Sequence, residues 1–351
     1  MNQRVERLRA QLDGLAAESF LVSHPVNVRY LTGFESSNAF VLVKHKQVVL
    51  LTDGRYIGAA RAVEGVEAIL VDRDFTPGVA SALPGLADGS LAFEADHLTV
   101  ARHASLAASG LDLVPASGVV LELRAVKEDA ELDEIRRAAR IADSVYERLA
   151  QERLAGRTEQ DVAWWFEQSL REEGADGIAF DITVASGPNA ALPHHHTGER
   201  TIGAGETVVV DAGARVDGYC SDCTRTFATG PLPEDLRRAY ATCRAAQEAA
   251  LSGVCAGADA RGVDEIARQE IEGAGFDVLH GLGHGVGLEV HELPVMRPTA
   301  EGVLEPANVV TVEPGVYLEG RGGVRIEDLV IVTENGAEVL TPFTKELVAL
   351  D

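Results

Sequence analysis

Four acidic residues follow or flank strand-like segments of this sequence, and their positions suggest a metal site. Asp211 follows the run TVVV and Asp222 lies further along the stretch TVVVDAGARVDGYCSDCTRTF. Glu313 follows the similar run VVTV, and Glu327 lies in VRIED. Isolated ionised carboxylates are costly to bury, so acids beside buried strands are usually paired, hydrogen-bonded or bound to a cation.

The first two acids are expected on one face of a β-hairpin. The Asp-Gly pair at 217–218 tolerates the positive φ of a type I′ turn, which makes it a strong hairpin signal. With that turn, Asp211 pairs with Thr224. Asp211 and Asp222 then lie on one diagonal, about 7–8 Å apart or less, within reach of a shared cation. Gly213, opposite Asp222, is expected to leave room for that cation.

The C-terminal strands repeat this arrangement. A glycine-rich turn at 320–323 separates Glu313 from Glu327, and residue 320 is their midpoint, so we expect these two acids to face one another. Two such hairpins predict a pseudo-symmetric site. Four carboxylates crowded together without a cation would repel one another and take up protons. An oxygen-rich site for two divalent ions therefore explains the pattern better than four unrelated strand-end acids.

Two groups of histidines are candidates for the same site. His280, His284 and His291 lie in or beside the glycine-rich stretch HGLGHGVGLEVHE, where alternate glycines allow close backbone approach. A neutral imidazole there can complete a metal shell, and an ordinary hydrogen-bonded role is the alternative. The stretch is not a dinucleotide fingerprint, because Val286 occupies the last glycine position. Consecutive side chains point in different directions, so we expect one residue of the run 194–196 in the site and the others in solvent.

The cysteines are expected to be structural thiols. Cys220 and Cys223 have C-x-x-C spacing, but residues three apart on a strand face opposite ways. No second C-x-x-C pair completes a four-cysteine site. The four cysteines in all are also too few for a disulfide framework in a chain of this length, which is compatible with a reducing compartment.

Composition indicates a globular chain that binds neither membranes nor nucleic acid. The 351 residues are 46% hydrophobic, enough for two domains or one large one. No run approaches the roughly 18 apolar residues of a membrane span, and the charged N-terminal segment does not look like a secretory signal, so a cytoplasmic location is expected. A net charge of -24 argues against nucleic acid or an anionic membrane as the main partner.

The order of predicted elements indicates two domains. Strand-like and helix-like segments alternate over the first part of the chain, which predicts a small α/β domain. Apolar residues at helical spacing then predict a helix over 127–154, so we place the boundary near residue 122 and define domains 1–122 and 123–351. Further helices are expected over 158–174, 233–252 and 260–273.

The motifs together resemble those of the pita-bread metallopeptidases, in the proline-selective branch of Xaa-Pro dipeptidases (prolidases) and Xaa-Pro aminopeptidases (aminopeptidase P). In the second domain the resembling segments are GPNAALPHH, DAGARVDGYCSDCTRTF, HGLGHGVGLEVHE, TVEPGVY and GGVRIED. SHPVNVRYLTGF and LLTDGRYIGAAR resemble the N-terminal domain of the creatinase type. The resemblance thus covers nearly the whole chain. It implies an α/β creatinase-like N-terminal domain followed by an α+β pita-bread catalytic domain.

The resemblance also implies two divalent metal ions per subunit. Its five ligand positions fall on Asp211, Asp222, His284, Glu313 and Glu327. Asp222 and Glu327 would bridge the two ions. Four carboxylates and one imidazole form a hard ligand set, which favours Mn²⁺, with Co²⁺ and Zn²⁺ as alternatives.

Other residues have roles implied by the same resemblance. His194 and His291 would contact the scissile carbonyl or the tetrahedral intermediate, and Arg325 would orient or neutralise the carboxylates. Glu313 would take a proton from the metal-activated water and pass it to the proline nitrogen. Arg297, from its place in HELPVMRP alone, is a candidate for binding the C-terminal carboxylate of the substrate. A solvated surface arginine is the alternative.

The expected activity is hydrolysis of the Xaa-Pro bond of dipeptides, with proline-containing dipeptides or short peptides as substrates. A compact chain and a short interval between Glu313 and Glu327 favour this activity over aminopeptidase P, which shares every catalytic residue named above. A non-catalytic pita-bread binding module is disfavoured, because all five ligand positions hold ligating residues. The resemblance further implies a homodimer.

Overall fold

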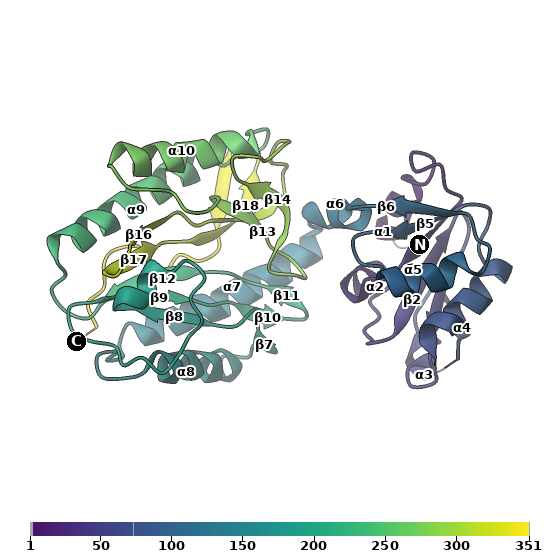
Figure 1. The fold of residues 1–351 in the computed structure, drawn as a ribbon, viewed down its shortest axis with the longest axis horizontal. Helices are drawn as coiled ribbons and strands as arrows, with labels where there is room; N and C mark the ends of the chain where they lie inside the picture. The colour runs from purple at the N-terminus through teal and green to yellow at the C-terminus, as the bar shows by residue number, and fades with distance from the viewer. Residues whose placement is uncertain (1–2, 73, 351) are drawn as a thin grey trace. The chain divides into compact units, whose positions relative to one another are not determined.

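The computed structural model describes residues 3–72 and 74–350. The chain divides into two compact units, Met1–Arg124 and Ala125–Asp351, each with mixed α/β structure (Figure 1). Residue 122, near which the sequence places the domain boundary, lies inside helix α6 (Val119–Ala125). Within the described ranges, no helix combines the length and the apolar character that crossing a membrane requires.

The N-terminal unit is built on one six-stranded sheet, and its mixed strands and helices confirm the small α/β domain that the sequence predicts. The strand order is β4-β3-β2-β1-β5-β6. Strand β2 pairs antiparallel with both β1 and β3, whereas β4 pairs parallel with β3, β5 with β1, and β6 with β5. The bounds are β1 Ser19–Val22, β2 Ala39–Lys44, β3 Val48–Thr52, β4 Glu67–Leu70, β5 Leu91–Glu94 and β6 Leu113–Ala116.

Helices flank this sheet, with α4 (Phe75–Ala82) and α5 (Val100–Ala107) contributing to its principal core. Alternate residues of β2, Phe40 and Leu42, join that core because side chains two apart on a strand share a face. The Phe40 ring meets the Phe75 ring edge to face, with centroids 5.1 Å apart. The remaining helices are α1 Gln3–Arg9, α2 Pro25–Thr32 and α3 Ile57–Ala60.

The second unit contains the four helices that the sequence predicts, with strands between them. Helices α8 and α10 lie on opposite sides of the strands (Figure 1). The helix bounds are α7 Asp129–Leu149, α8 Glu159–Glu172, α9 Glu234–Ser252 and α10 Ala260–Gly273. The strand bounds are β7 Gly177–Ile178, β8 Thr183–Ser186, β9 Thr207–Asp211, β10 Ala214–Val216, β11 Tyr219–Cys220, β12 Thr224–Ala228, β13 Gly283–Gly285, β14 Glu292–Met296, β15 Val309–Val312, β16 Gly315–Leu318, β17 Gly322–Arg325, β18 Asp328–Thr333 and β19 Gly336–Val339.

Two hydrophobic cores divide this unit into similar halves. In one, Tyr146 of α7 and Phe166 of α8 pack with Val210 of β9. In the other, residues of α9 and α10 pack with Val312 of β15 and Val330 of β18. Each half therefore buries a helix pair against a strand pair, and each strand pair ends at the acids described below.

The C-x-x-C cysteines face opposite ways, as predicted. Cys220 packs with Leu132 of α7 in one hydrophobic cluster, whereas Cys223 packs in the core formed with α7 and α8. Both cysteine side chains are buried. Burial raises the pKa of the Cys223 thiol well above its ordinary value. This thiol therefore stays protonated at neutral pH and is a poor nucleophile.

Candidate metal centre

The first predicted hairpin forms with the predicted register. Asp211 of β9 lies opposite Thr224 of β12, and Val216 lies opposite Tyr219 in the continuation through β10 and β11. Asp217, with φ 43°, precedes Gly218, with φ 76°, at the turn. Both residues have the positive φ that a type I′ turn needs. The sequence-based pairing of this hairpin is therefore confirmed.

The expected space for a cation beside Gly213 is not present, and this part of the hairpin prediction is wrong. A Cβ atom at Gly213 would overlap the carbonyl oxygen of Ser221, so the neighbouring backbone fills that space. The ladder is irregular here, because the Ala214 amide donates to Ser221 Oγ at 3.0 Å. Gly213 instead lets the two strands approach closely, which brings Asp222 towards Asp211.

Substituting alanine for Gly213 is expected to destabilise the second unit by about 1–3 kcal/mol and to weaken metal binding, because the Ser221 backbone must move and Asp222 moves with it. Thermal melts with and without Mn²⁺ measure both effects. Gly273→Ala is the matched control, since nothing lies within 4 Å of its Cβ position at the end of α10. An unchanged melting temperature in Gly213→Ala would contradict the close-approach explanation.

The second hairpin also has the predicted register. Gly315 lies opposite Arg325 in the β16–β17 ladder, and Val312 lies opposite Asp328 in the β15–β18 ladder, which places the centre of the register at residue 320. Glu313 and Glu327 occupy the gap between the two ladders. Their amides do not bond to each other's strand. The Glu313 amide donates to the Leu282 carbonyl oxygen at 2.8 Å, and the Glu327 amide donates to the Thr224 carbonyl oxygen at 3.0 Å. The second of these bonds joins the two hairpins.

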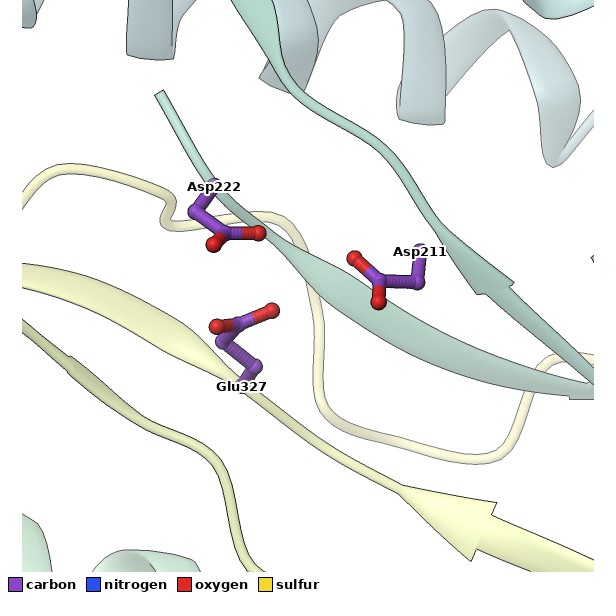
Figure 2. A group of neighbouring side chains, drawn as sticks. All are labelled: Asp211, Asp222 and Glu327. Carbon is purple, nitrogen blue, oxygen red and sulfur yellow. The ribbon is translucent and has the colours of Figure 1, made fainter. Parts of the chain in front are cut away.

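Three carboxylates from the two hairpins meet in one place. Asp211, Asp222 and Glu327 each offer an oxygen, and these oxygens all lie within 4.8 Å of one another. Figure 2 shows the three side chains directed at a common space. Asp222 is 5% exposed and Glu327 is 1% exposed, so the cluster is largely removed from water. Such crowding is expected only where protons or cations offset the charge.

His284 and Glu313 complete the group. His284 Nε2 lies 3.2 Å from Glu313 Oε1 and 3.8 Å from Asp222 Oδ2. His284 lies on β13, which pairs with both β14 and β15, and Glu313 follows β15 directly. All five residues at the implied ligand positions line one cavity of about 520 Å³. The fold thus brings together the residues that the sequence singles out.

The carboxylates perturb one another. Burial raises the pKa of Asp222 well above its ordinary value, and the charge on Glu327 adds to the effect. Burial likewise raises the pKa of Glu327, with Glu313 contributing next. For Glu313 burial acts in the same direction, but the hydrogen bond and charge of His284 outweigh it and hold the pKa of Glu313 below its ordinary value. In the absence of a cation, part of this cluster therefore takes up protons.

The residues present fit a bound divalent ion. Asp211 Oδ1 is buried and has no hydrogen-bond donor within the part of the chain that the structure describes. The other oxygen of this side chain, Oδ2, accepts a hydrogen bond from Arg325 Nη2 at 2.6 Å. A buried carboxylate oxygen without a donor carries an uncompensated desolvation cost, which a cation would offset. Together with the hard, oxygen-rich donor set, this indicates a site for a divalent cation.

Arg325 forms several hydrogen bonds at the edge of the carboxylate cluster. Besides the bond to Asp211, its guanidinium donates to Thr224 Oγ1, Tyr317 Oη and the Pro193 carbonyl oxygen, each at 3.2 Å. Although burial disfavours its charge, Tyr317 and Asp211 hold the pKa of Arg325 well above its ordinary value. Arg325 therefore remains a fixed cation that orients Asp211.

The other predicted site residues line the same cavity. His194, His291 and Arg297 are all among its lining residues. The His291 and His284 rings lie 4.3 Å apart between centroids. Burial, followed by the nearby His284, lowers the pKa of His291, so its imidazole is neutral at pH 7. Arg297 is exposed, and no hydrogen bond or ion pair engages its guanidinium among residues 3–72 and 74–350.

Some contacts were not anticipated from the sequence. Of the run 194–196, His196 is exposed as expected, but His195 is not in solvent, since its Nε2 lies 2.9 Å from Glu159 Oε2 and its side chain is 11% exposed. His280 lines the cavity and has the hydrogen-bonded role left as its alternative, with Nε2 2.9 Å from Tyr317 Oη. These partners are far apart in sequence, so no local pattern could identify them.

A buried ion pair beside His291 was missed as well. Lys127 Nζ lies 3.2 Å from Glu292 Oε2, and each side chain is 1% exposed. In the sequence, the one sign of this ion pair is the position of Glu292 directly after His291 in the VHE motif. Lys127 lies in an ordinary charged stretch that gives no indication of its partner. The pair anchors the chain next to His291.

Comparisons with known proteins agree with this geometry. Residues 4–126 match the Creatinase/Prolidase N-terminal domain, and residues 133–334 match Metallopeptidase family M24. An Xaa-Pro dipeptidase of Pyrococcus furiosus is 32% identical over 360 residues, which cover 99% of this chain and 100% of that protein. A solved Xaa-Pro dipeptidase from Bacillus anthracis has a TM-score of 0.95 and 37% identity, over 99% of both chains.

A solved X-Pro aminopeptidase from Thermotoga maritima is also similar, with a TM-score of 0.89, 32% identity and coverage of 99% of this chain and 100% of that one. The expected resemblance and the two-domain fold class are thereby confirmed. Because the family model spans most of the second unit and the relatives are similar over almost their whole length, this chain belongs to metallopeptidase family M24 and carries a creatinase/prolidase N-terminal domain.

Proposed function

We propose that this protein is a dinuclear-metal peptidase that hydrolyses the Xaa-Pro bond of dipeptides. The observation that carries the proposal is the convergence of four carboxylates and His284 in one cavity, where a buried oxygen of Asp211 has no donor from the described part of the chain. The names of the Pyrococcus furiosus and Bacillus anthracis relatives support an Xaa-Pro dipeptide as substrate. The Thermotoga maritima neighbour favours a second candidate, Xaa-Pro aminopeptidase.

Five side chains would hold the metal ions: Asp211, Asp222, His284, Glu313 and Glu327. The hard donor set favours Mn²⁺, with Co²⁺ and Zn²⁺ as alternatives. When bound, two such cations lower the pKa of a water molecule and polarise the scissile carbonyl. Asp222 and Glu327, which come from different hairpins, are the two carboxylates proposed as bridges.

Side chains that line the cavity would transfer the proton and hydrogen-bond the carbonyl oxygen. His284 Nε2 and Thr311 Oγ1 lie 3.2 Å and 3.3 Å from Glu313 Oε1, and the lowered pKa of Glu313 keeps it ionised at neutral pH. Glu313 is therefore suited to accept a proton from water and return it to the proline nitrogen. His291, neutral at pH 7, and His194 are the proposed hydrogen-bonding partners of the carbonyl oxygen.

Turnover of Ala-Pro and Ala-Pro-Ala by metal-stripped protein, before and after Mn²⁺ is added, tests the proposal. We expect activity to depend on the added metal and to be confined to the dipeptide. Efficient cleavage of the tripeptide would make the protein an aminopeptidase P instead. Absence of both activities at full metal occupancy would reject a peptidase of this specificity and reopen the non-catalytic binding module.

Arg297 is the proposed partner of the substrate carboxylate, because it lines the cavity and no described residue engages its guanidinium. Arg297→Gln is expected to raise KM for Ala-Pro about 10–100-fold with little change in kcat, since a charge-assisted hydrogen bond contributes roughly 1.5–3 kcal/mol. Ala-Pro amide, which lacks the carboxylate, is the matched control. If the substitution raises KM for Ala-Pro amide as much as KM for Ala-Pro, Arg297 does not bind the substrate carboxylate.

We further propose a homodimer and a cytoplasmic location. The homodimer follows from the family resemblance, and the location from the small number of cysteines, which is compatible with a reducing compartment. Light scattering on the purified protein and cell fractionation test these two proposals separately.

A further inference from the structure

We propose that Glu159 is a positioning residue for His194, holding the segment that carries this histidine in place beside the cavity. The inference rests on the proposed function, in which His194 contacts the substrate. Glu159 lies at the first position of α8 and is fully buried, with 0% exposure. A buried carboxylate needs several partners, and where those partners lie indicates what it stabilises.

Among the residues that the structure describes, every hydrogen-bond partner of the Glu159 carboxylate belongs to one short segment, 186–195. Its Oε1 accepts hydrogen bonds from the amide and the hydroxyl of Ser186, both at 2.8 Å. Asn189 Nδ2 lies 3.0 Å and 3.1 Å from the two carboxylate oxygens. His195 Nε2 lies 2.9 Å from Oε2. The carboxylate thus spans the end of β8, the short 3-10 helix Gly187–Ala191 and the residue next to His194.

The segment around His194 depends on such tethers because it forms no β-ladder of its own. His195, on one side of His194, bonds to Glu159, and the Pro193 carbonyl oxygen, on the other side, accepts from Arg325 Nη1 at 3.2 Å. Arg325 in turn bonds to Asp211 at the carboxylate cluster. His194 is therefore held between one anchor on α8 and one anchor at the candidate metal centre.

The groups that face the Glu159 carboxylate are hydrogen-bond donors. The Ser186 amide and Asn189 Nδ2 can only donate, and the Ser186 hydroxyl can rotate to donate. His195 Nε2 donates as well in the tautomer that carries its hydrogen on this nitrogen. A glutamine at 159 has nearly the same volume but turns an acceptor into a donor, so at least one of the three partners loses its bond.

Two variants of the same helix turn separate positioning from stability. Glu159→Gln is expected to lower kcat for Ala-Pro about 10–100-fold, with KM and Mn²⁺ affinity changed less than about threefold, because a small displacement of an aligned group costs turnover. Asp161→Asn is the matched control, since the exposed Asp161 carboxylate caps the Thr158 amide of this turn and does not reach the 186–195 segment. It is expected to keep kcat within about twofold.

A double-mutant cycle with His194→Ala provides the decisive readout. If Glu159 acts through His194, Glu159→Gln should lower kcat less than about twofold in the His194→Ala background, because the effects of substitutions at interacting residues are not additive. Equal losses in the two backgrounds would overturn the proposal and leave Glu159 with a general structural role. Should Glu159→Gln fail to fold, His195→Ala removes one tether without altering the carboxylate, and an unchanged kcat in that variant would overturn the proposal as well.

Hydrogen exchange distinguishes this inference from the proposed function. Amides of 186–197 should exchange faster in Glu159→Gln than in Asp161→Asn, while the remainder of the second unit exchanges alike. This result supports the tether even if the wild-type protein cleaves neither peptide, an outcome that would reject the proposed function alone. Unchanged exchange in 186–197 would reject the tether whatever the activity of the wild-type protein.

Discussion

Replacing Asp222 with asparagine is expected to abolish peptidase activity while leaving the fold of the second unit intact. Asp222 is buried between the hairpins, with an oxygen within 4.8 Å of those of Asp211 and Glu327. Removing the charge that is proposed to bridge the two ions should lower kcat/KM by at least about 10³-fold, because bound cations contribute several kcal/mol of charge stabilisation. Assay of Ala-Pro cleavage, with bound Mn²⁺ counted by calorimetry, measures the loss. Full turnover at matched metal occupancy would reject the dinuclear assignment.

The same variant should behave differently without metal. The pKa of Asp222 is raised in the folded protein, mainly by burial, so the folded state holds its proton more tightly than the unfolded state does. Such a group lowers stability progressively as pH rises above about 4, the unfolded pKa, towards the folded pKa. In chelator, Asp222→Asn should therefore melt at or above the wild-type temperature, with an advantage that is larger at pH 7 than at pH 5. A lower melting temperature at both pH values would contradict this account.

Arg325→Met is expected to produce the largest loss of stability, about 3–5 kcal/mol in the metal-free protein, because it removes one partner of a buried ion pair. Arg325 and Asp211 side chains are 6% and 19% exposed, and Nη2 lies 2.6 Å from Oδ2. The substitution also leaves Thr224 Oγ1 and the Pro193 carbonyl oxygen without this donor. Urea unfolding of wild type and variant in chelator measures the difference.

Metal should reduce the Arg325→Met defect, since a cation beside Asp211 offsets the charge that the arginine no longer balances. We therefore expect Mn²⁺ to raise the melting temperature of the variant more than that of the wild type. Arg321→Met is the matched control, because Arg321 is an exposed arginine on the adjacent turn that pairs with Asp235 at the surface. Equal destabilisation by the two substitutions would show that the buried pair has no special role.

The local elements were largely predictable from the sequence, for identifiable reasons. Thr158 predicts the start of α8 because its side chain accepts from the Asp161 amide in a capping box. The Asp-Gly pair at 217–218 predicts the register of its hairpin because both residues adopt positive φ. These are signals in which neighbours along the chain decide the geometry. Gly213 shows their limit, since its lack of a side chain serves backbone approach rather than a ligand.

The residues at the ligand positions of the candidate site could be predicted from the sequence, but the residues that hold them in place could not. Types and spacing, together with the family resemblance, identify Asp211, Asp222, His284, Glu313 and Glu327, and the fold places all five around one cavity. The partners that position them lie far away in sequence. Arg325 reaches Pro193 across the unit, and Lys127 reaches Glu292. No spacing rule connects such residues.

The sequence by itself therefore determined the strands, the turns and the residue types that a hard cation needs, because hydrophobic period, turn chemistry and ligand chemistry are local properties. Only the tertiary structure decided which side chains share a desolvated space. It placed His195 beside Glu159 rather than in solvent, and it gave Asp211 Oδ1 no donor among residues 3–72 and 74–350. Burial and distance set both the pKa values and the unsatisfied groups, and these depend on how distant segments pack.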